Sequence, residues 1–185
     1  MDIFTAFGLS ASAGLNAYIP LLVIALLARF TDLIRLNAPW DAIESWWVIA
    51  VLVVLSIIEF FADKVPAVNH VNDMVQTFVR PAAGAVVFLA SSGAGETHPV
   101  LAATAGILVA GSVHVAKSAA VRPAVTAATG GTANVPVSIL EDIASTLLSI
   151  LAVVIPVLVA AIAIPLVSLL IWWFWRRAKR QNLVQ

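Results

Sequence analysis

Five long apolar stretches separated by short polar segments make up most of the chain. They run from about residue 3 to 28, 46 to 62, 74 to 91, 100 to 121 and 143 to 175. A helix needs about 20 residues to cross about 30 Å of hydrocarbon. The pattern therefore predicts an all-α, polytopic transmembrane bundle of about five spans, with six as the alternative. The third stretch is short enough to be tilted or re-entrant, and the fifth is too long for one upright crossing. Pro156 and Pro165 lie inside the fifth stretch, where a proline kinks or ends a helix.

Composition supports this prediction and excludes several classes of protein. Apolar residues make up 62% of the 185 residues and charged residues only 11%, against about 25% charged residues in an ordinary soluble domain. The mean hydropathy is +1.03. These values exclude a soluble globular domain, a disordered tail and a nucleic-acid binder. The chain has no cysteine, which excludes disulfides, thiolate nucleophiles and cysteine-ligated metal centres. We expect one transmembrane domain over residues 1–185, embedded in a lipid bilayer, with a short basic tail over residues 176–185.

Basic residues and tryptophans predict the orientation. An acid, Asp2, stands where a secretory signal would carry basic residues, so the first stretch is predicted to be an uncleaved span. Lysine and arginine favour the cytoplasmic side, and tryptophan favours the interface. With five crossings, both basic and tryptophan-rich regions are cytoplasmic and the amino terminus is outside, whereas six crossings would place the first loop outside. The residues concerned are Arg29, Arg35, Trp40, Trp46 and Trp47 in the first region and Trp172, Trp173, Trp175, Arg176, Arg177, Lys179 and Arg180 in the tail.

Ionisable residues gather at the ends of the apolar stretches that five crossings would place towards the outer leaflet. An unpaired charge in hydrocarbon costs several kcal/mol, so these residues are expected to face the bundle interior and to pair. The alternative is that they lie in the outer headgroup region and pair with solvent or lipid. The set comprises Glu59, Asp63, Lys64, Asp73, Arg80, His114, Lys117, Arg122, Glu141 and Asp142.

Spacing suggests which of these residues act together. Glu59 and Asp63 are four residues apart and share a helix face. Two close carboxylates do not both ionise freely, so we expect this pair to handle an ion or a proton. Asp73 and Arg80, seven residues apart, are predicted to pair. We expect a base of the fourth stretch to pair with Glu141 or Asp142.

Two stripes of mostly small residues recur at four-residue intervals. Small residues allow transmembrane helices to approach closely, which accounts for most of both stripes. Packing alone does not require Asn16 or His114, so we include these two as candidate site residues. The stripes are Gly8, Ser12, Asn16 and Pro20 in the first stretch and Ala102, Gly106, Ala110, His114 and Ser118 in the fourth.

Residues 123–137 contain prolines, glycines and threonines and no charge, so a continuous helix is not expected there. This segment, with Asn134, is predicted either to line a cavity or to form an ordinary outer loop. Ser138 and Glu141 have the spacing of a capping box that would start the fifth helix. The four-residue sequence that begins at Val79 recurs at Val121, which suggests a weak internal repeat. Residues 14–20 also resemble residues 131–136 faintly.

Several blocks resemble an uncharacterised bacterial membrane family, the domain of unknown function 4126. They are Ala13-Gly14-Leu15-Asn16-Ala17 with Pro20, then Glu59, Ala62-Asp63-Lys64 and Pro66, then Thr77-Phe78-Val79-Arg80-Pro81 with Gly84, and Lys117, Arg122, Pro136, Ser138 and Glu141-Asp142. The resemblance covers nearly the whole chain and implies a multi-pass protein of the bacterial inner membrane. It implies no activity.

The residues favour a channel or secondary transporter for a small ion or polar solute, which would use a charged pocket between helices. The alternatives are a membrane-embedded enzyme or lipid-phosphate-handling protein and a structural subunit. Catalytic motifs, phosphate loops and cofactor motifs are absent from the sequence, so no cofactor is expected and an enzyme is less favoured. A homo-oligomer is left open. In the lipid-handling alternative, the bases that would grip a phosphate are Lys64, Arg80, Lys117 and Arg122.

Overall fold

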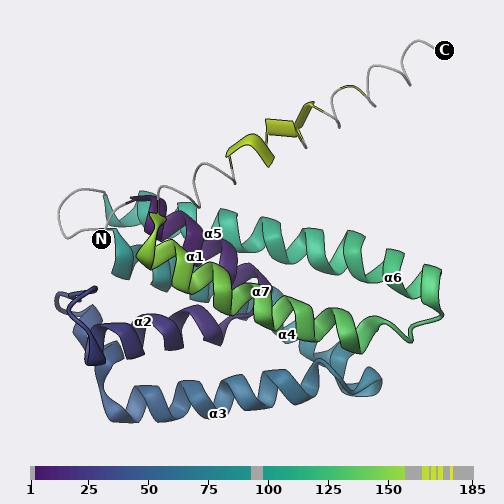
Figure 1. Ribbon diagram of the computed structural model, residues 1–185, viewed down its shortest axis with the longest axis horizontal. Helices are drawn as coiled ribbons and strands as arrows, with labels where there is room; N and C mark the ends of the chain where they lie inside the picture. Colours follow the sequence, from purple (N-terminus) through teal and green to yellow (C-terminus); the bar gives the residue numbers. More distant parts are fainter. Residues whose placement is uncertain are drawn as a thin grey trace.

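The computed structural model describes residues 3–92, 98–156, 164–166, 168–169, 171–172 and 176. The regular secondary structure of these residues is helical (Figure 1). No strand occurs among these residues, which confirms the all-α prediction. The helices are α1 (Ile3–Leu15), α2 (Tyr18–Phe30), η1 (Trp40–Glu44), α3 (Trp46–Ala62), α4 (Pro66–Ser91), α5 (Pro99–Ala116), η2 (Lys117–Val121), α6 (Arg122–Thr129) and α7 (Asn134–Val154).

The distribution of side chains is that of a membrane protein. Three helical segments are long and apolar enough to span a bilayer: Val71–Ser91, Pro99–Thr129 and Asn134–Val154. Large apolar side chains such as Phe78 and Leu108 are 77% and 65% exposed, whereas Arg80 is 0% exposed. Apolar residues outside and charges inside are the arrangement expected in lipid, where polar groups must find partners within the protein.

The first apolar stretch does not cross the bundle, contrary to the prediction of a single span over residues 3–28. It forms a helical hairpin in which α2 turns back alongside α1, and Leu9 and Ile24 pack in one buried cluster (Figure 1). The chain breaks at Asn16 because its Oδ1 accepts hydrogen bonds from the backbone N–H groups of Tyr18 and Ile19. This carbonyl caps a new helix at the point where an unbroken helix would have continued.

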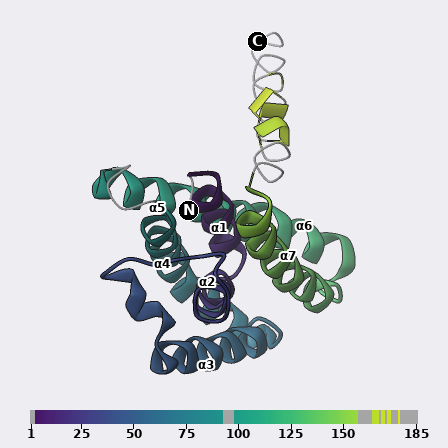
Figure 2. The same ribbon diagram turned by 60° about the vertical axis from the view of Figure 1, so that its left-hand side comes forward.

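The hairpin lies in the middle of the bundle, with the long helices around it (Figure 2). Against α4, the Ser10 hydroxyl donates to the Gly84 carbonyl across 3.0 Å. Against α7, the Oγ atoms of Ser12 and Ser149 lie 2.6 Å apart. The predicted small-residue stripe therefore faces α7 through Ser12, whereas Ser10, which is not part of the stripe, faces α4.

A close helix contact joins α4 and α5. A Cβ added to Gly84 would collide with the Ala110 side chain, and one added to Gly106 would collide with the backbone of Gly84. Only glycine permits this approach of two backbones. The stripe predicted on α5 lies in this contact, since Ala102, Gly106, Ala110 and His114 are its buried residues.

Helix boundaries differ from the predicted stretches in three places. The third is one continuous helix, α4, which starts at Pro66 and passes through Pro81, so it is neither short nor re-entrant. The fourth continues through η2 and α6 to Thr129, so residues 123–129 are helical and only a turn with left-handed Gly130 and Gly131 separates them from α7. The fifth helix ends at Val154, before Pro156, as a helix-breaking proline requires.

The hairpin also changes the predicted path of the chain. Because α1 and α2 are antiparallel neighbours, the start of α1 lies at the same end of the bundle as the end of α2 and the loop 31–45 (Figure 1). This arrangement differs from the predicted single crossing, which would separate the amino terminus from this loop. Helices α3, α4, α5 with its continuation, and α7 then run between this end and the opposite one. Trp173, Trp175, Arg177, Lys179 and Arg180 lie outside the described residues.

Candidate functional site

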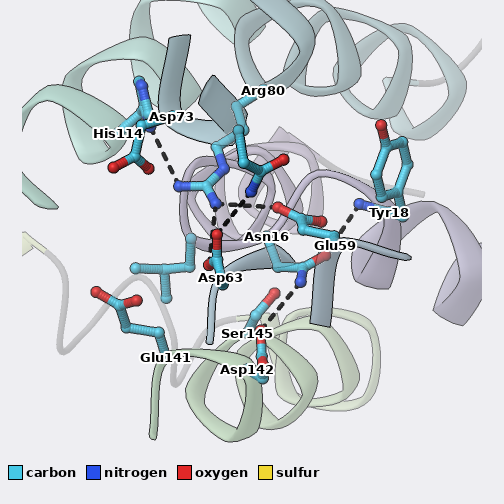
Figure 3. A network of polar contacts seen from close by, with 12 residues as sticks. Asn16, Tyr18, Glu59, Asp63, Asp73, Arg80, His114, Glu141, Asp142 and Ser145 are labelled. Carbon is cyan, nitrogen blue, oxygen red and sulfur yellow. Dashed lines mark hydrogen bonds and ion pairs between the residues drawn. The ribbon is translucent and has the colours of Figure 1, made fainter. Parts of the chain in front are cut away.

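The predicted ionisable residues converge at the tip of the hairpin, near the end of the bundle that lies away from the loop 31–45 (Figure 3). They come from the end of α3, from α4, from the junction of η2 and α6, and from α7. We call these nine side chains the charge network. Its members are Glu59, Asp63, Lys64, Asp73, Arg80, Lys117, Arg122, Glu141 and Asp142.

Arg80 holds the most deeply buried part of the network. Its Nη2 lies 2.9 Å from Oε1 of Glu59 and 3.8 Å from Oδ2 of Asp63, and the three side chains are 0%, 1% and 2% exposed. Figure 3 shows both carboxyl groups beside the same guanidinium. Glu59 and Asp63 thus share a face of the α3 end, as their spacing predicts, and a base from another helix bridges them.

Asp63 is the carboxylate on which most of the cations converge. Its Oδ2 is 3.0 Å from Arg122 and 3.6 Å from Lys117, in addition to its contact with Arg80. Its Oδ1 accepts a hydrogen bond of 2.7 Å from Asn72. A carboxylate at such a depth needs several donors to offset the loss of water, and Asp63 has them.

Three further pairs complete the network towards its rim. Lys117 lies 2.8 Å from Glu141, Arg122 lies 3.2 Å from Asp73, and Lys64 lies 3.2 Å from Asp142. The prediction that a base of the fourth stretch pairs with Glu141 or Asp142 is confirmed. The predicted pairing of Asp73 with Arg80 is wrong: the two residues share a helix, but each side chain reaches a partner on another helix.

The hairpin tip is bound into the network through both of its helix ends. The carboxyl end of α1 offers carbonyls without helical partners, and these attract cations. Lys117 Nζ donates to the Leu15 carbonyl across 3.0 Å, and Arg80 Nη1 approaches the Gly14 carbonyl at 3.5 Å. Asn16, which caps α2, donates from Nδ2 to Asp142 across 3.0 Å.

A π turn, η2, brings Lys117 and Arg122 to one face. The N–H of Arg122 bonds the carbonyl of Lys117, five residues earlier. In a regular α-helix, residues five apart point about 140° away from each other. The wider turn instead lets both bases contact Asp63 and Glu141. Single π turns of this kind recur at functional sites.

His114 is held as a neutral imidazole by its neighbours. Arg80 Nη1, which can only donate, lies 3.1 Å from Nδ1, so this nitrogen carries no proton. Nε2 then carries the hydrogen and donates to the Thr77 hydroxyl at 3.2 Å, which in turn donates to the Asp73 carbonyl. His114 therefore positions the guanidinium and adds no charge to the network.

Three pockets between helices reach the network from different sides. The largest, of ≈ 700 Å³, is lined by Asp73 and Arg122 together with polar residues of α4, α6 and α7. A second, of ≈ 330 Å³, is lined by Asn16, Ser56 and Asp142 with apolar residues of α2 and α3. A third, of ≈ 360 Å³, lies along Lys117 and Glu141.

Asn134 stands apart from the other predicted site residues. The structure places it in the first turn of α7, hydrogen-bonded to Thr126 and lining the largest pocket, but not in contact with a network charge. The predicted capping box at Ser138 is also wrong, because α7 already begins at Asn134. Glu141 therefore faces Lys117 and Arg122 in the bundle.

Sequence reasoning missed several polar residues that complete the site. Asn72 supports Asp63, Thr77 supports His114, and Ser145 and Ser149 bond Ser12. Ser145 and Ser149 are four residues apart, which is the interval that defines the stripes in the first and fourth stretches. The same periodicity in residues 138–149 therefore points to these two serines.

The paired residues of the suggested internal repeat have different structural surroundings. Arg80 lies in the middle of α4, whereas Arg122 starts α6. Asn16 is buried at a helix break, whereas Asn134 follows a glycine turn and is half-buried. In the part of the chain that the structure describes, no group of three or more acidic, histidine or cysteine side chains is arranged to hold a metal ion.

Comparison with known proteins gives one match. A family model described as a domain of unknown function (DUF4126) matches residues 3–177, which is nearly the whole chain. No curated protein and no solved structure matches the sequence or the fold.

Proposed function

The chain belongs to the DUF4126 family, and we propose that it is an integral membrane channel or secondary transporter for a small ion or polar solute. The charge network and the hairpin tip would form the pathway. The residues proposed to contact the ion or solute are Asn16, Glu59, Asp63, Lys64, Asp73, Arg80, His114, Lys117, Arg122, Asn134, Glu141 and Asp142.

The observation that carries this proposal is the position of the hairpin break at the centre of the charge network. Irregular backbone at membrane depth is tolerated where protein or a water-filled cavity satisfies it. Helix ends that point at a shared polar site are the feature from which transporters build substrate sites. Here Lys117 and Arg80 donate to carbonyls at the end of α1, and the amides at the start of α2 donate to Asn16.

The largest pocket supports access to this site. Its ≈ 700 Å³ are sufficient for a small polar solute, and its lining includes Asp73, Thr77 and Arg122. From Thr77, a continuous chain of hydrogen bonds leads through His114 to Arg80 and Glu59. A solute in the pocket would thus contact groups that are coupled to the buried pair.

Charge balance favours this function over the handling of lipid phosphates. A phosphate site needs bases that can turn to the phosphate. Each of the four bases of the network, Lys64, Arg80, Lys117 and Arg122, is already engaged by at least one carboxylate.

We further propose that the protein lies in a bacterial inner membrane with its basic tail in the cytoplasm. The loop 31–45, flanked by Arg29 and containing Arg35, would lie on the same side. The charge network would then open towards the outer leaflet, where an external solute arrives.

Purified protein in liposomes tests the proposed function. Fluxes of protons, sodium, potassium and chloride would be followed with ion-sensitive dyes, and lipid scrambling would be measured in parallel. We expect flux of at least one ion, lost in Asp63→Asn and retained in Asp41→Asn, which removes an exposed carboxylate of the loop. Lipid scrambling without flux would overturn the proposal, as would flux that Asp63→Asn leaves unchanged.

A further inference from the structure

We propose that Glu59 binds one exchangeable proton on Oε2, and that this proton is the ion that drives or accompanies transport. The inference rests on the proposed function for its role in transport, but not for the binding of the proton itself. Three observations carry it: the charge of the network, the partners of its carboxylate oxygens, and the kind of atoms around Glu59.

The first observation is that the network has one negative charge more than it has positive charges. It contains five carboxylates and four bases, and His114 is neutral. The acids are Glu59, Asp63, Asp73, Glu141 and Asp142, and the bases are Lys64, Arg80, Lys117 and Arg122. A net charge that is buried in a membrane bundle is costly unless a counter-ion or a proton neutralises it.

The second observation locates the surplus charge. Both oxygens of Asp63 accept hydrogen bonds, and so do both oxygens of Asp73 and of Asp142. Glu141 contacts Lys117 and Arg122 through Oε2, and its side chain is 11% exposed. Glu59 differs from all four, because Oε1 accepts from Arg80 but Oε2 is buried and has no hydrogen-bond partner in the part of the chain that the structure describes. The side chain as a whole is 1% exposed.

The third observation is that acceptors outnumber donors among the other buried, unpartnered polar atoms of α3 and α4. Among the described residues, Oε1 of Gln76, Oγ of Ser56 and Oγ of Ser91 can accept a hydrogen, whereas Nε of Arg80 can only donate. A proton on Oε2 would turn Glu59 from an acceptor into a donor. We take as its acceptor Oε1 of Gln76, which is one turn from Arg80, the residue that bonds Glu59.

A proton fits this place better than a metal cation. Hard metal cations take about six or more oxygen ligands. Among the described residues, the unpartnered buried oxygens that could contribute are those of Glu59, Gln76 and Ser56, two of which are neutral. Proton uptake requires none of these ligands and leaves Arg80 charged and bonded to Oε1: the carboxylate takes H⁺ from water and becomes a carboxylic acid.

Charged and titratable groups face Glu59 from every helix packed around it. Asp63 lies on its own helix, Tyr18 on α2, Arg80 on α4 and Lys117 on η2. Arg80 bonds Glu59 but also contacts Asp63 and His114, so its charge does not compensate Glu59 alone. A pocket lined by Ser56, Asn16 and Asp142 lies beside this part of α3, since Ser56 is one helical turn from Glu59.

Infrared difference spectroscopy of the full chain tests the binding of the proton without measuring transport. Spectra at a series of pH values, with choline as the only added cation, would follow the C=O stretch of a protonated carboxylic acid. We expect a pH-dependent band equivalent to one carboxylic acid per chain. Glu59→Gln, whose amide imitates the protonated side chain, should lose this band. The matched control Glu44→Gln, in the loop 31–45, should retain it.

A second variant keeps the test independent of how Glu59→Gln folds. Gln76→Leu removes the acceptor and should shift the band to higher frequency, because the acid O–H loses a hydrogen bond. A band that persists in Glu59→Gln, or that sodium or potassium abolishes in the unmodified protein, would overturn the proposal. A Glu59 band in a protein without flux would support the proton site while overturning transport. Flux with no Glu59 band would support transport while overturning the proton site.

Discussion

Nη2 of Arg80 donates to Oε1 of Glu59 across 2.9 Å, between two side chains that are both at most 1% exposed. The two residues belong to neighbouring helices, α4 and α3. A buried ion pair of this kind contributes little when it is compared with a well-packed apolar pair, but removing one partner leaves an uncompensated charge. The pair therefore makes the stability of the bundle depend strongly on either residue alone.

The first prediction concerns the loss of this base. Arg80→Ala should lower the free energy of unfolding by about 3–5 kcal/mol, because Glu59 and Asp63 would lose their shared cation. Unfolding by sodium dodecyl sulfate in mixed micelles measures this difference. Arg35→Ala, which removes an arginine whose side chain is 86% exposed, should change stability little.

A double variant separates the lost charge from the lost packing. Arg80→Gln combined with Glu59→Gln removes both charges and should be more stable than Arg80→Gln alone. If Arg80→Ala unfolds at the same detergent concentration as the unmodified protein, Arg80 is solvated and the buried pair does not exist in the membrane.

The second prediction tests the hairpin. The chain has no cysteine, so single introduced cysteines can be labelled without background. In inside-out and right-side-out vesicles, Ile3→Cys and Thr31→Cys should react with an impermeant maleimide from one side. Thr132→Cys, in the turn before α7, should react from the other side. Labelling of positions 3 and 31 from opposite sides would show that the first stretch crosses the bilayer.

The third prediction concerns the contact between α4 and α5. Gly84→Ala should cost about 1–3 kcal/mol, because its Cβ would collide with the Ala110 side chain and force the helices apart. Gly111→Ala is the matched control, since a Cβ there would make only an ordinary contact with Pro81 at 3.7 Å. Thermal unfolding in detergent compares the two, and equal melting temperatures would contradict the close approach.

The fourth prediction concerns the π turn. Deleting Ala119 would leave Lys117 and Arg122 four positions apart, which closes one ordinary α turn and keeps both bases on one face. Deleting Val115 instead disrupts the spacing of His114 and Lys117 within a regular helix. We expect the first deletion to retain a monodisperse, folded protein on size-exclusion chromatography and the second to lose it. The opposite order would show that an ordinary α turn does not align the bases and that the extra residue of η2 is needed.

Composition and charge were sufficient to predict the fold class and most of the site. A charge in a transmembrane helix must find a partner, so Glu59, Asp63, Arg80 and Lys117 could be assigned to one interior cluster before any helix was placed. The spacing of Glu59 and Asp63 placed them on one face, and the structure confirms it.

Partner choice could not be predicted, because periodicity describes one helix and pairing joins two. Asp73 and Arg80 have a spacing that suits a pair, yet Asp73 contacts Arg122 at the start of α6 and Arg80 contacts Glu59 on α3. The π turn was equally hidden, since nothing in Lys117–Val121 distinguishes it from regular helix.

The hairpin could not be recognised from hydropathy. Residues 3–28 are apolar enough to cross, and only the bonds from Tyr18 and Ile19 to Asn16 reveal the break. A helix break needs a local cap and a tertiary partner, and the partner, Asp142, lies 126 residues away in the sequence.

The serine hydroxyls between α1 and α7 have a mechanical consequence. Ser12 Oγ lies 2.7 Å from both the carbonyl and the hydroxyl oxygen of Ser145 and 2.6 Å from the hydroxyl oxygen of Ser149, one turn along α7. A hydroxyl both donates and accepts, so Ser12 can bond both serines at once. A slide of one turn, about 5.4 Å, would break these bonds together with those from Thr5 to the Ala152 carbonyl and from Asn16 to Asp142. The interface therefore holds the hairpin and α7 in one register.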